Sequence, residues 1–153
     1  MLTGRPALAT VLLCLVCLLA LKPQPAAAAA AAIRCTRDII KWVGELIKKT
    51  SDLQWLDCRL YTPTIQDYQQ NCPSSTLKCF ADEVKVLVKE WETVGVVGFR
   101  NLKLNIKLEI LASRFNQTES ECRQCELLKV QNATVFLEDL RSTLQIINTD
   151  FCR

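Results

Sequence analysis

The sequence predicts an all-α protein built as a small bundle of four helices. Apolar residues recur at steps of three and four in four separate segments, which is the period of a helix with one buried face. The stretch between the first two segments contains prolines, an asparagine and several glutamines, and this composition predicts a long connection. Four helices in a chain of this length, with one long first connection, fit a bundle around one core.

The first two helices are expected over residues 39–53 and 75–91. Thr36 is placed to cap the first, and Ser74 or Ser75 is placed to cap the second. Residues 57–75 between them are expected to form no strand. The apolar face of the second segment consists of Leu77, Phe80, Val84, Leu87 and Trp91.

The third segment is ambiguous, because apolar and polar residues alternate strictly over residues 102–110, as in a half-buried strand. A helix is nevertheless expected, since a lone strand would lack a hydrogen-bonding partner. A helical stripe is also present, formed by Leu104, Leu108, Leu111 and Phe115. Gly95 and Gly98 predict a loop before it.

The fourth segment has the clearest helical period. Its apolar residues are spaced by four, three, four, three and four positions, which predicts a stripe facing a core. They are Ala133, Leu137, Leu140, Leu144, Ile147 and Phe151.

The N-terminal segment, residues 1–32, has the composition of a secretory signal peptide. Arg5 precedes an uncharged apolar run over 7–21, and the alanine tract over 26–32 offers small residues for cleavage. The run is shorter than the ~20 residues that span a bilayer and ends at Lys22, which argues against a membrane anchor. We therefore expect a secreted, extracellular protein whose mature domain is residues 33–153.

The composition of residues 33–153 excludes several classes of function. Loss of Arg5 and Lys22 from 19 basic residues leaves 17 against 16 acidic ones, a net charge of +1, so neither nucleic-acid binding nor electrostatic membrane binding is expected. With no histidine and no Gly-rich phosphate loop, catalysis finds little support, and no cofactor is expected.

Seven cysteines remain after residue 32, and in an oxidising compartment they indicate disulfides with one cysteine left over. A zinc site is a weak alternative, because only Cys122 and Cys125 are closely spaced. A redox role for that pair is also weak, since no βαβ pattern precedes it and it is expected at the start of the last helix. Two sequons, at Asn116 and Asn132, predict N-glycosylation.

Several motifs resemble the interleukin-15 family, within the short-chain four-helix cytokines related to interleukin-2. The cysteine frame is the most specific, with C-x6-C from Cys72 to Cys79, 42 intervening residues, and C-x2-C from Cys122 to Cys125. The order and spacing of Leu60-Tyr61-Thr62, residues 118–126 and Phe136-Leu137 with Gln145 and Asn148 also match. The resemblance extends from Leu60 to the C-terminus, whereas residues 39–53 share only the apolar period.

The resemblance implies an up-up-down-down, disulfide-stapled bundle in which Cys72 pairs with Cys122 and Cys79 with Cys125. In that topology the start of the first helix and the end of the last share one end, so Cys35 is expected to pair with Cys152. Cys58 is expected to be free or to form an intermolecular bridge.

The resemblance also implies a monomeric ligand that assembles three receptor chains. A sushi-type alpha chain would contact Tyr61, Glu83 and Glu90. The common gamma chain would contact the last helix around Gln145.

The beta chain would contact the first and third helices, with Asp38 or Glu45 as the acidic residue. Lys103 or Lys107 replaces the acidic or amide residue that the family would have at the facing position of the third helix.

Two alternatives remain open from the sequence. One is another short-chain cytokine such as interleukin-2. The other is a saposin-like lipid-binding module, which the cysteines at the two chain ends favour and the sequons and one-sided stripes disfavour.

Overall fold

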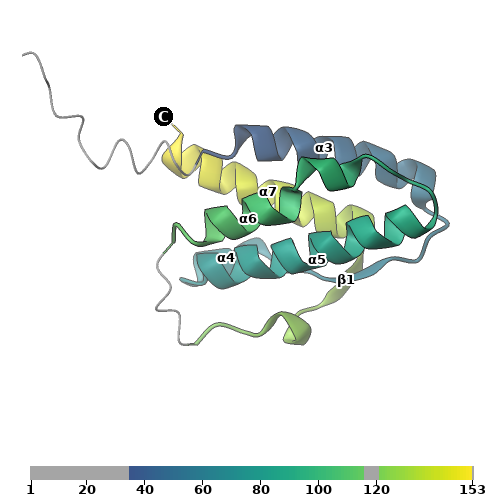
Figure 1. The fold of residues 1–153 in the computed structure, drawn as a ribbon. Helices are drawn as coiled ribbons and strands as arrows, with labels where there is room; N and C mark the ends of the chain where they lie inside the picture. Colours follow the sequence, from purple (N-terminus) through teal and green to yellow (C-terminus); the bar gives the residue numbers. More distant parts are fainter. Residues whose placement is uncertain (1–34, 116–120, 153) are drawn as a thin grey trace, which may run out of the picture. The chain divides into compact units, whose positions relative to one another are not determined.

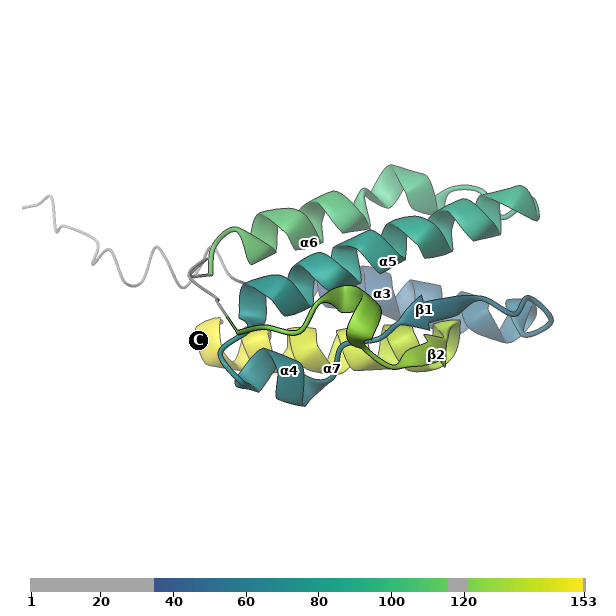
Figure 2. The same ribbon diagram turned by 90° about the horizontal axis from the view of Figure 1, so that it is seen from below.

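The computed structural model describes residues 35–115 and 121–152, within the compact unit Arg34–Arg153. Figures 1 and 2 show α3 and α5 running in one direction along the bundle and α6 and α7 returning, so the predicted all-α, up-up-down-down fold is confirmed. In chain order these helices are α3 (Arg37–Thr50), α5 (Pro73–Thr93), α6 (Leu104–Ala112) and α7 (Ala133–Phe151). No helix in the described part of the chain is long and apolar enough to cross a membrane.

The core lies between two packed pairs of helices, α5 with α6 and α3 with α7. All four contribute fully buried leucines, and the rings of Phe80 on α5 and Phe136 on α7 pack with their centroids 5.5 Å apart. Burial of each such side chain stabilises the fold by about 1.5–3 kcal/mol. Packing across the bundle therefore fixes the faces that the helices expose.

Helix α6 explains why its sequence also fits a strand. Leu104, Leu108 and Leu111 are buried against α5, as the helical stripe predicts. Ile106 and Ile110 complete the alternating pattern but point outward, with 43% and 48% of their surface exposed. Two solvent-facing isoleucines thus produce the strand-like period in a real helix.

The first connection contains structure that the sequence analysis did not predict. Strand β1 (Arg59–Tyr61) pairs antiparallel with β2 (Val130–Asn132), so that Arg59 lies opposite Asn132 and Tyr61 opposite Val130. The short helix α4 (Ile65–Gln69) follows, held by a capping box between Thr64 and Asp67. The expectation of no strand over residues 57–75 was therefore wrong.

Helix starts also differ from the expected caps. Helix α5 begins at Pro73, with Cys72 at the N-cap, because proline has no N–H to leave unpaired in the first turn. Ser74 and Ser75 lie inside that turn and do not cap it. Thr36 does occupy the N-cap position of α3, but its buried hydroxyl donates to the carbonyl oxygen of Leu144 on α7, 2.8 Å away.

The loop expected around Gly95 and Gly98 is present between α5 and α6. Both glycines have positive φ angles of 84° and 107°. A 3-10 helix, η2 (Phe99–Leu102), follows and ends at Lys103, whose φ of 47° is also left-handed.

Candidate functional site

A carboxylate on α5 fastens the first connection to the bundle. The backbone N–H of Tyr61 in β1 donates to Oε2 of Glu83, at 2.8 Å. Because β1 lies beside α5, two of the three residues that the resemblance assigns to alpha-receptor contact are joined directly.

The Glu83 carboxyl is half-buried among like charges. Burial raises its pKa above the usual range, the hydrogen bond from Tyr61 opposes that rise, and the charges of Asp82 and Glu126 add to it. A partly desolvated carboxylate with acidic neighbours gains from a cationic partner, because the partner supplies the attraction that water no longer does.

Glu90 lies two turns further along the same side of α5, and its negative charge also raises the pKa of Glu83. Burial raises the pKa of the Cys58 thiol, and its hydrogen bond to Glu90 adds to the effect. Cys58 is free and only 2% exposed, so an intermolecular bridge there would require local opening.

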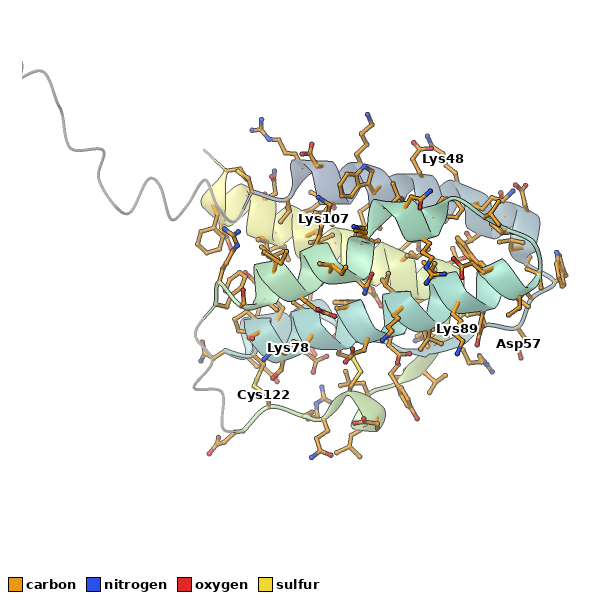
Figure 3. All side chains as sticks on the ribbon, viewed as in Figure 1. Lys48, Asp57, Lys78, Lys89, Lys107 and Cys122 are labelled. Carbon is orange, nitrogen blue, oxygen red and sulfur yellow. A yellow bond between two sulfur atoms is a disulfide. The ribbon has the colours of Figure 1, made fainter. Side chains whose placement is uncertain are left out.

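Two disulfides hold the segment that precedes β2 against the start of α5. Cys72 joins Cys122 and Cys79 joins Cys125, with Cα atoms 5.7 and 5.4 Å apart, and these pairs match those that the resemblance implies. Figure 3 shows Cys122 beside this end of α5. The expected position at the start of the last helix was wrong, because Cys125 instead opens the 3-10 helix η3 (Cys125–Leu127) and α7 begins at Ala133.

An ion pair reinforces the same segment between the two bridges. Arg123 donates to Asp67 of α4, whose other oxygen is held by Thr64. Burial pushes the pKa of Asp67 upward, but the hydrogen bonds from Thr64 and Arg123 lower it overall. The bridges and the ion pair together fix η3 beside β1 and α5.

Three further residues at this place were not among the site residues expected from the sequence. Glu126 and the exposed Leu127 belong to η3, and the exposed Val130 lies opposite Tyr61 in the sheet. Glu83 is one turn beyond Cys79, so the bridge to Cys125 brings Glu126 close to it. We call Tyr61, Glu83, Glu90 and Glu126 the acidic seam.

The third disulfide joins Cys35 to Cys152, at a Cα separation of 5.3 Å. It links the start of α3 to the end of α7, as the bundle topology led us to expect. Each of the described cysteines except Cys58 is thus bridged, and Cys122 and Cys125 are not bridged to each other.

The candidate beta-chain residues lie on one exposed side of α3. Asp38 and Glu45 flank Trp42 at helical spacing, and the ammonium group of Lys107 from α6 lies 4.6 Å from the centre of the Trp42 ring. Glu45 forms an exposed ion pair with Lys48, at 2.9 Å. The structure therefore places a cation of α6 beside this acidic stripe of α3.

The candidate gamma-chain residue, Gln145, is exposed on α7. Its neighbour Leu144 is fully buried, and the Gln145 carbonyl accepts a hydrogen bond from Thr149. Among the described residues, no hydrogen bond involving the Gln145 side chain is present, so that amide is available to a partner.

The two sequons differ in what the structure describes. Asn132 is exposed at the N-cap of α7, where its Oδ1 accepts from the N–H of Val135 at 3.0 Å. The nitrogen of that amide remains available to carry a glycan. Asn116 lies outside the described residues, as do the expected signal peptide and its cleavage region.

Comparisons with known proteins agree on one family. A family profile described as Interleukin 15 matches residues 11–148. Interleukin-15 of Macaca mulatta is 32% identical over 114 residues, covering 71% of this chain and 69% of the relative, and that of Homo sapiens is 31% identical with the same coverage. Interleukin-15 of Oryctolagus cuniculus is 30% identical over 107 residues, covering 70% of this chain and 62% of the relative.

No solved structure matches the chain. The profile nevertheless spans most of the sequence, and the matched region contains the cysteines and carboxylates that build the acidic seam. The chain belongs to the interleukin-15 family and is a cytokine.

Proposed function

We propose that this cytokine is a secreted, monomeric ligand that signals to lymphocytes by assembling a sushi-type alpha chain, a beta chain and the common gamma chain. Residues 1–32 act as the signal peptide, cleaved within 26–32, and residues 33–153 are the mature cytokine. Glycans are carried at Asn116 and Asn132. The family match supports the cytokine class, and the separate exposed surfaces support contacts with several chains.

The alpha chain binds the acidic seam. The observation that carries this assignment is the hydrogen bond from Tyr61 to the half-buried Glu83, which holds a carboxylate at the surface in a fixed position. A basic receptor surface complements this charge, and the exposed Leu127 and Val130 add apolar contact at its edge.

The other two chains bind elsewhere on the bundle. The gamma chain binds α7 around Gln145, and the beta chain binds the Asp38–Glu45 side of α3. Lys107 beside Trp42 gives the α3–α6 surface a mixed charge. An acidic partner residue facing Lys107 would fit it.

The alpha-chain assignment is tested with Glu83→Gln and the purified soluble receptor ectodomain. The amide still accepts the hydrogen bond from Tyr61, so the variant removes the charge and keeps the shape. We expect at least a tenfold loss of affinity, since ~1.4 kcal/mol is one decade. Glu109→Gln, an exposed change on α6, is the control and is expected to bind within about twofold of wild type.

If Glu83→Gln bound the alpha ectodomain as tightly as wild type, the alpha chain would not bind at the acidic seam. Failure of the wild-type protein to bind any of the three ectodomains would overturn the ligand proposal itself.

Location is tested by expression in animal cells. The protein is expected in the medium, starting within or just after residues 26–32, with a mass that falls on enzymatic removal of N-glycans. Retention in the membrane fraction with Met1 present would contradict it.

A further inference from the structure

A second surface of α5 carries charge of the opposite sign. A groove of about 550 Å³ runs between α5 and the segment formed by η2 and the start of α6. Its cationic side chains come from both walls, Lys85 and Lys89 from α5, and Arg100 and Lys103 from the other wall. We call these four residues the basic groove.

None of these four cations has an ion-pair partner among residues 35–115 and 121–152, and all four residues are exposed. Glu92 is the single acidic residue in the lining. The mature chain has a net charge of about +1, whereas the groove has an excess of three positive charges. Positive charge is therefore concentrated in the groove.

The wall opposite α5 is held in place. The ring of Phe99 in η2 packs edge-on against Trp91 of α5, with centroids 5.5 Å apart. Lys103 ends η2 with a left-handed φ of 47°, where glycine or asparagine is more readily accommodated. Among the described residues, Lys103 shares this positive φ only with Asn71 and with Gly95 and Gly98.

Lys85 and Lys89 are one helical turn apart, which spaces their Cα atoms by roughly 6 Å along α5. Asn101 and Asn105 also line the groove, and their amides can bind hydroxyl groups. Cations on two facing walls, with amides on the η2–α6 wall, suit a single chain that carries regularly repeated anionic groups and hydroxyls.

We propose that the basic groove binds a linear sulfated polysaccharide of the extracellular matrix or cell surface. The choice of an extracellular partner rests on the secretion stated under the proposed function. A flat lipid surface would contact the groove from one side, whereas a linear chain lying in the groove contacts the cations of both walls along its length. A single-stranded nucleic acid is usually held by stacking of its bases on exposed aromatic rings, whereas Phe99 in this groove is packed against Trp91.

The two surfaces of α5 can be occupied together. Lys85 is two residues beyond Glu83, a rotation of about 200° around the helix. Lys85 therefore lies on the side of α5 away from Glu83, whereas Lys89, six residues beyond Glu83, lies about 120° from it around the helix, and Figure 3 shows Lys89 extending from α5. Polysaccharide binding would retain the cytokine near cells while leaving the alpha-chain surface open.

The test measures binding of the secreted protein to immobilised heparin at 0.15 M salt. The groove variant combines Lys85→Gln, Lys89→Gln and Arg100→Gln. Lys103 is left unchanged, because a substitution at its left-handed backbone position would alter backbone strain as well as charge.

A matched control variant removes the same charge from exposed lysines outside the groove. It combines Lys41→Gln, Lys78→Gln and Lys129→Gln. Circular dichroism and alpha-ectodomain binding are measured on every preparation, so a folding defect is separated from loss of the groove.

Wild type is expected to bind heparin but not desulfated heparin, with an affinity that falls steeply as salt rises. The groove variant is expected to bind at least tenfold more weakly, and the control variant within about twofold of wild type. Lys89→Gln alone, which leaves most of the wall intact, is expected to bind about threefold more weakly.

If the groove variant and the control variant lost heparin affinity equally, the proposal would be overturned. Binding would then depend on the total positive charge of the protein and not on the basic groove. Binding to phosphatidylserine vesicles without heparin binding would replace the polysaccharide with a membrane, and equal binding to desulfated heparin would remove the role of sulfate. Loss of heparin binding with alpha binding retained separates this surface from the acidic seam. Failure of wild type to bind the alpha ectodomain while it binds heparin would contradict only the receptor proposal.

Discussion

The two sides of α5 use charge in different ways. On the acidic seam, Glu83 is half-buried, hydrogen-bonded to backbone and surrounded by like charges. In the basic groove, Lys85 and Lys89 are exposed, and no ion pair to either is present in the described part of the chain. Glu83, Lys85 and Lys89 lie on the same helix, so the contrast between them comes from what packs beside each side of α5.

That contrast separates two kinds of recognition. A fixed, partly desolvated carboxylate discriminates between partners, because a partner that does not neutralise it leaves a buried charge unpaired. Exposed lysines act at longer range and are screened by salt. We therefore expect the acidic seam to set specificity and the basic groove to set local concentration.

The largest expected effect comes from releasing η3 with Cys79→Ala/Cys125→Ala. The bridge closes a loop of 46 residues, and its loss is expected to lower the free energy of unfolding by about 3–4 kcal/mol. Alpha binding should fall by more than tenfold because Glu126 and Leu127 lose their position. Denaturant unfolding, non-reducing peptide mapping and ectodomain binding measure these effects.

Cys35→Ala/Cys152→Ala is the matched control, since that bridge joins residues 117 apart but touches neither side of α5. It should reduce stability by a similar or larger amount while leaving alpha binding within about twofold. Equal losses of alpha binding in both variants would show that general stability, and not the acidic seam, governs recognition.

The next effect concerns a third surface, remote from the acidic seam. Gln145→Asp is expected to reduce gamma-chain recruitment and signalling at least tenfold, because a carboxylate would be buried unpaired against the receptor. Gln145 is exposed, so the free energy of unfolding should change by less than about 0.5 kcal/mol.

Thermal unfolding, alpha binding and receptor-driven phosphorylation are measured on one preparation of Gln145→Asp. Full signalling by a well-folded variant would show that the family's gamma site does not carry over to this chain.

The helices of the bundle were predictable because their apolar periods are strong. The strand β1 was not, since its partner β2 lies about 70 residues away and each has only three residues. Helix α4 was signalled by Thr64 and Asp67 at capping-box spacing, a signal that the proline-rich surroundings obscured.

The candidate site was only partly predictable for the same reason. Tyr61, Glu83 and Glu90 came from the resemblance, and local sequence pattern gave no reason to group them. Their grouping depends on the β1–β2 pairing and on the bridge from Cys79 to Cys125. The position of Lys107 over Trp42 depends on the packing of α6 near α3, which periodicity does not encode.

A smaller effect is the pH dependence that Glu83 gives to stability. Its pKa is raised in the folded state, so the folded protein holds the proton more tightly and stability declines as pH rises above the ordinary value of 4.5. Glu83→Gln should therefore be more stable than wild type at pH 7, and the difference should vanish at about pH 4 and below. Urea unfolding across pH 3–7 measures it.

Asp67→Asn is expected to change stability at pH 7 in the opposite direction. The pKa of Asp67 is lowered in the folded state, so its contribution is present above 3.8 and is lost as pH falls through the folded value. This variant should be less stable than wild type at pH 7, with a deficit that shrinks in acid. If both Glu83→Gln and Asp67→Asn lowered the free energy of unfolding at pH 7, the Glu83 carboxylate would serve stability and not binding.

The smallest expected effect belongs to Glu92, the acidic residue of the basic groove. Its carboxylate opposes a polyanion, but it shares the groove with four cations and lies one turn from Lys89 on α5. Removing one partly exposed charge changes an interaction by roughly 0.5 kcal/mol, so Glu92→Gln should raise heparin affinity about twofold at 0.15 M salt. At 1 M salt the Debye length is about 3 Å, and the gain should disappear. Alpha binding should not change, because Glu92 faces away from the acidic seam. Weaker heparin binding by Glu92→Gln would mean that this carboxylate positions Lys89 for the polysaccharide. The cations of the basic groove would then be held in fixed positions, as Glu83 is in the acidic seam.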